Sequence, residues 1–328
     1  MTRNANRAVL SLLASAAVWG AIGARPAAAQ WVFCDQTPST PLLVGAYQRY
    51  VTMAGDGTNL ALWNENRTSG GIEMRTSSSG YTGFGAPTLT TGLAGLAHPK
   101  IYGGGGGYTG LFWDSTQVAP NGIVRLTSTD GLAWSNSTQV TIANSPYLTS
   151  KIWGAVGYFE NIAGDTDVLY YTQGTGANEQ LYRATATDGV QFTHQGTAFV
   201  NPASPGLGTG ISCGSQVRYD PILGEFMLLW CGESSTEDIN YAASADGLSF
   251  TYQGTVVLDT GTAGHTDLEE TSFVLNGPSL VGVYTADFGG DSSNHIGAYT
   301  GVLIPEPVTV GLLGCGALAL RRRRRRAR

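Results

Sequence analysis

A turn motif that recurs three times at a constant interval constrains the fold of this chain more than any other feature. Each copy is an Asp-Gly pair with an aromatic residue three positions after the glycine, and Asp130, Asp188 and Asp246 follow one another at intervals of 58 residues. Asp-Gly tolerates the positive φ angles of a two-residue hairpin turn. The motif predicts repeated antiparallel hairpins, and a strand-rich repeat near this length predicts one propeller blade per copy.

Five segments of this kind can be drawn along the chain, and in each the second strand ends in an aromatic residue followed by polar ones. The last segment lacks an outermost strand, and the strand-like stretch Trp31–Cys34 is expected to supply it and so remove the exposed edges of an open ring. We therefore predict an all-β fold, a five-bladed β-propeller with four-stranded blades, over residues 30–304. The segments are Leu43–Gly92, Leu96–Ala143, Leu148–Val200, Gly210–Leu258 and His265–Ile304.

The N-terminus carries the pattern of a secretory signal. Arg3 and Arg7 precede an apolar run over residues 8–24, and Ala27-Ala28-Ala29 offers small residues at a cleavage site. Residues 1–29 are therefore predicted to be a signal peptide that engages the Sec translocon. A transmembrane anchor is the alternative for this segment.

The C-terminus combines three features in a fixed order: Pro305-Glu306-Pro307, an apolar run over residues 308–320, and six arginines at 321–326. The run is short for a helix that must span about 20 residues of bilayer, and the arginines favour the cytoplasmic side. Residues 305–328 resemble the PEP-CTERM sorting signal. The resemblance implies recognition by exosortase, a transient inner-membrane tail, and a mature protein at the cell surface or in the exopolysaccharide matrix of a Gram-negative bacterium. An ordinary tail anchor is the alternative.

Between these two ends the chain is strongly acidic. Residues 30–304 hold 8 Lys and Arg against 23 Asp and Glu, a net charge of −15. Such a surface repels nucleic acid and anionic lipid. It suits an extracellular domain and is compatible with cation binding, structural Ca²⁺ included, but no motif predicts a metal or a cofactor.

Export permits disulfides, and the sequence offers one candidate pair of cysteines. Cys213 and Cys231 fall on neighbouring strands of one hairpin if Tyr219 faces Phe226 across the turn. That register places Cys213 one residue away from the position opposite Cys231, so the pairing requires a bulge. A disulfide and two separate cysteines therefore both remain open.

Five blades with S-x-D-G-x-x-[FW] hairpins resemble the propellers of arabinanases, β-xylosidases, invertases and levansucrases. The resemblance covers roughly residues 43–304 and implies three carboxylates, from the innermost strands of different blades, around a central funnel. Hydrolysis of a glycosidic bond needs two carboxyl groups on either side of it. Here only the fifth segment is acidic at that position, with Asp267, Glu269 and Glu270.

The start of each first strand and the end of each second strand should share one face. This geometry predicts a polar funnel with catalytic candidates Asp267, Glu269 and Glu270, where crowding should raise at least one pKa. Trp63 and Trp153 can offer an apolar face to a sugar, or pack between blades as we expect for Trp113 and Trp230. The ligand-binding candidates are His98, Lys151, Glu65, Asp114, Glu233 and Asp287.

Three functions of different class are compatible with these features. The main prediction is a glycan-binding protein of the cell surface or the exopolysaccharide matrix. The alternative is a glycoside hydrolase or transglycosidase acting on plant or microbial polysaccharide. A structural component of the matrix is the third.

Overall fold

The computed structural model describes most of the predicted propeller. The described residues are 29–37, 41–44, 48–56, 58–104, 106–119, 121–146, 152–162, 166–174, 179–199, 210–211, 214–232, 238–257, 265–288 and 294–304. By internal contacts the chain divides into one unit of residues 1–32 and 302–328 and another of residues 33–301. Of the first unit, only 29–32 and 302–304 are described, so the predicted signal and sorting segments fall almost entirely outside the described residues.

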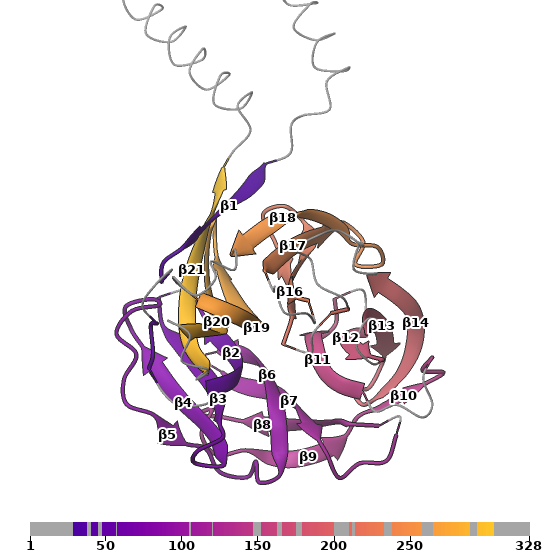
Figure 1. Ribbon diagram of the computed structural model, residues 1–328. Helices are drawn as coiled ribbons and strands as arrows, with labels where there is room; N and C mark the ends of the chain where they lie inside the picture. Colours follow the sequence, from indigo (N-terminus) through magenta and orange to yellow (C-terminus); the bar gives the residue numbers. More distant parts are fainter. Residues whose placement is uncertain are drawn as a thin grey trace, which may run out of the picture. The chain divides into compact units, whose positions relative to one another are not determined.

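The described part of the chain is all-β and forms five sheets (Figure 1). The first sheet has the order β2 (Gln48–Gly55), β3 (Leu60–Asn66), β4 (Gly71–Ser77), β5 (Thr88–Leu89). The second has the order β6 (Leu96–Gly104), β7 (Gly107–Asp114), β8 (Ile123–Ser128), β9 (Ser135–Gln139). Within the described ranges, no helix is long and apolar enough to cross a membrane.

The other three sheets follow the same antiparallel plan along the chain. The third has the order β10 (Thr141–Ala143), β14 (Gln191–Phe199), β13 (Gln180–Ala186), β12 (Asp167–Gln173), β11 (Ile152–Phe159). The fourth has the order β15 (Gln216–Asp220), β16 (Glu225–Cys231), β17 (Ile239–Ser244), β18 (Thr251–Val257). The fifth has the order β1 (Gln30–Asp35), β21 (Asn294–Ile304), β20 (Ser279–Phe288), β19 (His265–Asn276).

One detail differs from a plan of four strands in every sheet. Strand β10, expected at the end of the second segment, instead pairs in parallel with β14 of the third sheet. The backbone N–H of Val140 still donates to Ile123 in the second sheet, whereas that of Thr141 donates to Val190 in the third. The chain therefore changes sheet between these two residues, which gives the third sheet a fifth strand.

The first strands of the sheets contact one another in a closed circuit. Strand β2 contacts β6 and β19, β11 contacts β6 and β15, and β15 contacts β19. The core lies between adjacent sheets. Trp63 and Trp230 are completely buried there, as expected for aromatic residues that pack between blades.

The Asp-Gly motifs form turns, but longer ones than the predicted two-residue hairpins. Thr127 pairs with Ser135 across the first turn, and Ala243 pairs with Thr251 across the third. In the first turn the carboxylate of Asp130 accepts the backbone N–H groups of Leu132 and Ala133. The aspartate side chain thus bonds backbone N–H groups that have no partner strand within the turn. Gly131 adopts the positive φ of 76° that the turn requires.

The stretch Trp31–Cys34 lies in β1, which is the edge strand beside β21, as predicted. The chain stays attached beyond the strand, because the backbone N–H of Gln36 donates to Ala298 at 2.9 Å. The hydroxyl of Tyr284 donates to the carboxylate of Asp35 at 3.1 Å. The N-terminal strand therefore completes the sheet that the C-terminal strands begin.

Candidate functional site

Four of the five first strands contain a bulge near their N-terminal end, which is also where the second strand of the same sheet ends. The register shifts lie between Arg49 and Thr52 in β2, between Ala97 and Lys100 in β6, between Ile152 and Gly154 in β11, and between Thr266 and Glu270 in β19. Bulges reorient side chains and are frequent beside active sites. This end of the sheets is therefore the candidate site.

Two of the bulged residues have left-handed backbones without being glycine. Tyr50 has a φ of 51° and His98 a φ of 48°, conformations that are uncommon for such side chains and that cluster at functional sites. Their rings stack with centroids 3.6 Å apart. On its other side His98 stacks on Trp113 at 5.0 Å, and Trp113 contacts Trp153 at 5.8 Å.

Arg49 is the charge around which the acids of this end gather. Its Nη2 atom lies 2.5 Å from Glu269 Oε1, and its Nε donates to Asn294 Oδ1 at 3.0 Å. Burial alone would lower the pKa of Arg49, but the charges of Glu269 and Glu270 reverse this and the net shift is upward. Glu65 on β3 is the residue directly opposite Arg49 across the strand pair. We call Arg49, Glu65, Glu269 and Glu270 the Arg49 cluster.

Glu270 forms the buried side of the Arg49 cluster. Its side chain is 3% exposed, and its Oε2 accepts a hydrogen bond from the hydroxyl of Thr285. Burial raises the pKa of Glu270, against the opposing effects of Thr285, Arg49 and Lys100. Gly214 packs against it so closely that a Cβ there would lie 2.2 Å from Glu270 Cγ.

Glu65 forms a second acidic position, supplied by a different sheet. Its Oε1 lies 3.4 Å from Arg67 Nε, and its side chain is 18% exposed, compared with 24% for Glu269. Burial raises the pKa of Glu65, opposed by Arg67, by Arg49 and by the nearby backbone N–H of His98. The predicted rise in pKa is thus present at Glu65 and Glu270, but burial rather than mutual crowding of acids is its main cause.

His98 is buried and uncharged at neutral pH. Burial is the largest of the influences that lower its pKa to about 3, and the neighbouring cations Lys100, Arg67 and Arg49 add to it. Its Nδ1 lies 3.1 Å from the carbonyl oxygen of Trp153. A carbonyl can only accept, so Nδ1 carries the proton and the Nε2 atom of the neutral ring has the lone pair.

Lys100 connects the candidate site to the fourth sheet. It is 2% exposed, and its Nζ donates to the carbonyl oxygen of Gly214 at 3.0 Å. The same carbonyl accepts the backbone N–H of Thr271. Lys100 therefore anchors the loop before β15 against the strand that carries Glu269 and Glu270.

The structure brings together four of the predicted site residues. Glu65, His98, Glu269 and Glu270 converge, as the shared-face argument predicts. The carboxylate of Asp114 instead closes a turn by accepting from Thr116 and Gln117. Asp287 lies opposite Thr266 in the pairing of β19 with β20.

The remaining predicted positions are not tested by the structure. Lys151, Glu233, Cys213 and the Pro305-Glu306-Pro307 triplet lie outside the described residues, as does the side chain of Asp267. Tyr219 does pair with Phe226, the register on which the cysteine argument depends, and Cys231 is buried at the end of β16. The Cys213–Cys231 pairing stays a prediction.

The two tryptophans suggested as sugar platforms have different environments. Trp63 is buried and donates its indole N–H to Gly131, so it packs between sheets and presents no face to a ligand. Trp153 is 36% exposed, and its indole N–H donates to Gly174 at 3.0 Å. Of the two, Trp153 is therefore the one placed to meet a sugar.

Sequence reasoning missed Arg49, Tyr50, Lys100 and the role of Trp113. Arg49 was not among the predicted site residues, and Trp113 was expected to pack between blades. Pro99, directly after His98, is the one local signal for the bulge in β6, because proline cannot donate to a strand ladder. Among the described residues, no group of three or more His, Cys, Asp or Glu side chains could hold a metal ion.

Comparison with known proteins gives the class of fold. No family model matches the sequence, and no curated protein matches it significantly. A thermostable family-43 glycoside hydrolase is similar in structure, with a TM-score of 0.60 and 13% identity over 80% of this chain and 91% of that one. An endo-arabinase from Bacteroides thetaiotaomicron has a TM-score of 0.56 at 16% identity, over 82% and 98% of the two chains.

A Bacillus subtilis arabinanase is similar too, with a TM-score of 0.54 and 15% identity over 78% of this chain and 95% of that one. At such identities the likeness concerns the fold alone, and it is consistent with the propeller-like fold that the hairpin repeats indicate.

In the described first strands of the present chain, only β19 supplies carboxylates to the site. The other acid of the Arg49 cluster, Glu65, comes from the second strand of its sheet.

Proposed function

We propose that this protein is a five-bladed β-propeller that acts on polysaccharide as a glycoside hydrolase or transglycosidase at the Arg49 cluster. One observation carries the proposal: Glu65 and Glu269 approach the same arginine from two different sheets, at the bulged ends of the strands. Five sheets in a closed circuit of first strands support the five blades. The similarity in fold to family-43 enzymes favours hydrolysis over binding alone.

The two acids have environments suited to different tasks. The raised pKa of Glu65 favours the protonated form, which a general acid needs. Glu269 lies against the guanidinium of Arg49, which favours its ionised form as base or nucleophile. Glu270 is buried and its charge acts on Arg49 together with that of Glu269, and Trp153 offers a ring face to the sugar.

The test is turnover of arabinan, xylan and fructan by the protein and by Glu65→Gln and Glu269→Gln variants. Loss of a general acid or base lowers kcat/KM by about 10²–10⁴-fold, so we expect a loss of this size in each variant. Glu160→Gln is the matched control, because Glu160 also forms a pair with an arginine, Arg125 at 2.9 Å, on another part of the protein. Turnover that survives both active-site substitutions would contradict the assignment.

Glycan binding without hydrolysis is the second candidate. It is favoured by the aromatic stack of Tyr50, His98, Trp113 and Trp153, because ring faces bind sugars without any chemistry. Binding of arabinan or xylan by a protein that turns over none of the three polysaccharides would support it. A structural matrix role would leave both binding and turnover absent.

We also propose that the protein is exported through the Sec translocon and sorted by exosortase, so that the mature domain resides at the cell surface or in the matrix. The order of features at the two ends of the sequence supports this. Mass spectrometry of the mature protein should find cleavage near Ala29 and loss of the Arg321–Arg328 peptide. An extracellular product that retains this peptide would contradict sorting.

A further inference from the structure

A second concave site lies at the other end of the sheets from the Arg49 cluster. It is a groove of about 950 Å³ between the first and second sheets, a volume typical of ligand sites. It is lined by the end of β2, the start of β3 and the tip of the β6–β7 hairpin. Arg49 is the second residue of β2 and Gly55 ends the strand, so about 20 Å of strand separates the two sites. We call this groove the Tyr108 groove.

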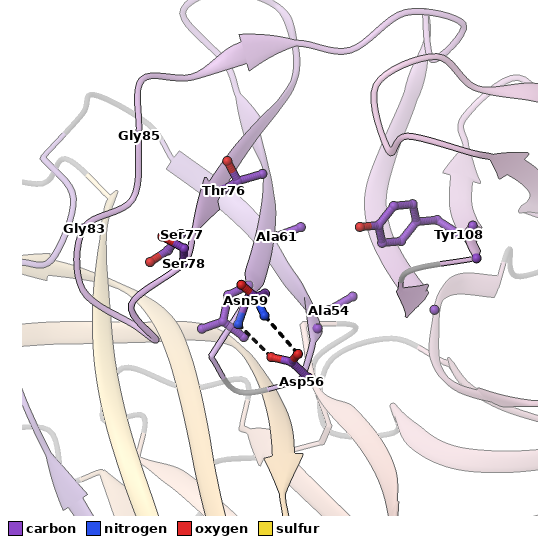
Figure 2. A pocket seen from close by; sticks show the side chains of 15 residues that line it. Ala54, Asp56, Asn59, Ala61, Thr76, Ser77, Ser78, Gly83, Gly85 and Tyr108 are labelled. Atoms are coloured by element: carbon purple, nitrogen blue, oxygen red, sulfur yellow. Dashed lines mark hydrogen bonds between the residues drawn. The ribbon is translucent and has the colours of Figure 1, made fainter.

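The lining of the Tyr108 groove is small and polar (Figure 2). Ala54 and Ala61 lie at its base, and Thr76 and Ser78 stand on the side of the first sheet. Backbone exposed by glycine makes up much of the remaining surface. The glycines of the lining are Gly55, Gly83, Gly85, Gly103, Gly106 and Gly107.

Four of these glycines have a positive φ and cannot be replaced without strain: Gly55, Gly83, Gly103 and Gly107. Gly55 has a φ of +140°, and a Cβ there would lie 2.1 Å from the carbonyl oxygen of Asn59. Gly103 has a φ of +112°, and a Cβ there would lie 2.3 Å from the carbonyl oxygen of Gly107. The backbone therefore requires glycine at these two positions, so neither of them places a side chain in the groove. At Gly106 an added Cβ would meet nothing within 4 Å.

Tyr108 supplies the aromatic wall. Its ring lies 5.1 Å from that of the buried Trp63, at an angle of 72°, which fixes its orientation. In Figure 2 the ring and its hydroxyl extend from the second sheet across the groove toward Ala61 and Thr76. A fixed, partly exposed ring with hydroxyl groups opposite it suits a sugar, which has apolar ring faces and hydroxyls around its rim.

The charge of the groove selects against anions. Asp56 is the one charged side chain among the described lining residues. Its carboxylate accepts the backbone N–H groups of Asn59 and Thr58 and the side-chain amide of Asn59. These hydrogen bonds lower the pKa of Asp56 and keep it ionised. A carboxylated or phosphorylated ligand would be repelled, whereas a neutral polyhydroxylated one would not.

We propose that the Tyr108 groove binds a neutral oligosaccharide chain and so provides a second glycan site, separate from the Arg49 cluster. It does not depend on any chemistry at that cluster, because no residue is shared between the two. Whether the Arg49 cluster hydrolyses or only binds, the Tyr108 groove would hold one part of a polysaccharide while the cluster contacts another part of the same polysaccharide.

The test is the affinity of the purified protein for xylohexaose, cellohexaose and maltohexaose, with oligogalacturonate as the anionic probe. Gly85→Met and Gly106→Met place a side chain in the groove from its two sides. Gly85→Ala and Gly106→Ala are the matched controls, since neither residue has a positive φ and neither added Cβ is crowded. We expect at least one neutral probe to bind, at least tenfold more weakly in the methionine variants and within twofold of the original protein in the alanine variants.

A Glu65→Gln/Glu269→Gln double variant separates the two sites, because binding in the groove should survive it whatever becomes of turnover. Amide chemical shifts of the lining glycines should move on addition of the probe. The proposal is overturned if none of the three neutral probes binds. It is overturned equally if both methionine variants bind as well as the original protein, or if oligogalacturonate binds more tightly than every neutral probe.

Discussion

At the scale of single residues, His98 shows how the candidate site departs from ordinary strand structure. A left-handed backbone at a histidine is uncommon, and here it turns the ring between Tyr50 and Trp113. Burial in that stack keeps the ring neutral and fixes its tautomer through Trp153. The residue therefore has a defined hydrogen-bonding state at the centre of the site, which a solvent-exposed histidine would lack.

The buried histidine makes stability sensitive to acid. The folded pKa of about 3 lies below the value of 6.5 for a free side chain, so the unfolded state binds the extra proton between these limits. Stability from this group is present above pH 6.5 and is lost at about 1.4 kcal/mol per pH unit as pH falls toward 3. Replacing His98 with Phe keeps a stacking ring and should make the acid dependence shallower by about this slope.

Urea unfolding between pH 7 and pH 4 measures this effect. Replacement of His194 with Phe is the control, because that histidine is only partly buried and has a more modestly lowered pKa. Glu65 and Glu270, whose pKa values are raised, respond in the opposite direction and are common to all three proteins. Identical slopes for the original protein and His98→Phe would show that His98 is not the buried neutral group described.

At the scale of elements, the Asp-Gly turns do more than connect strands. The carbonyl of Gly131 in the second sheet accepts the indole N–H of Trp63 from the first sheet at 2.8 Å. The carbonyl of Gly247 in the fourth sheet accepts the hydroxyl of Tyr170 from the third at 2.7 Å. The same turn position thus receives a polar atom from the aromatic core of the preceding sheet, which fixes the two sheets relative to each other.

Replacing Tyr170 with Phe tests this contact between sheets. The ring is completely buried, so the Gly247 carbonyl would lose its donor with no water to replace it. We expect a loss of about 1–3 kcal/mol in the free energy of unfolding, or about 3–8 °C in Tm. Tyr252→Phe, which removes an exposed hydroxyl, is the control and should change stability by less than about 0.5 kcal/mol. Equal effects would mean that the buried bond adds nothing.

At the scale of the whole molecule, the fifth sheet combines one strand from the N-terminal end of the sequence with three strands from its C-terminal end. Strand β1 occupies the edge beside β21, and Gln36, Thr37 and Asp35 attach the following chain to β20 and β21. Phe33 contacts Tyr241 of the fourth sheet at 5.6 Å. The N-terminal strand thus covers an edge that would otherwise be open to pairing with another chain.

Deletion of residues 30–36 should therefore lower the thermal midpoint by more than about 10 °C and promote aggregation, because β21 loses its neighbour and Tyr284 loses its hydrogen bond to Asp35. Differential scanning calorimetry and light scattering measure the two effects. Deletion of residues 305–328 is the control and should leave the midpoint unchanged. A deletion of β1 without thermal consequence would contradict the closing role of the strand.

Much of this architecture could be predicted from the sequence, because its signals are local. The repeated Asp-Gly motifs and the alternation of strands with turns predict an all-β, propeller-like fold. The pairing of Tyr219 with Phe226 follows from the turn between them, and the edge position of Trp31–Cys34 follows from the missing outermost strand of the last segment. The shared face of His98, Glu65, Glu269 and Glu270 follows from the antiparallel direction of first and second strands. The strands and turns need only neighbours along the chain, whereas the edge position of Trp31–Cys34 also uses the missing outermost strand of the last segment.

What the tertiary structure alone decided depends on contacts between sheets. The bulges of three first strands place Tyr50, His98 and Trp153 at the same end of the sheets, and only packing of the strands against one another makes this arrangement favourable. Arg49 acquires its role because β19 lies beside β2, although more than 200 residues separate Arg49 from Glu269. The pKa shifts follow from burial, which is a property of the assembled sheets. Sequence patterns report local backbone preference, whereas desolvation and charge pairing depend on which distant residues meet.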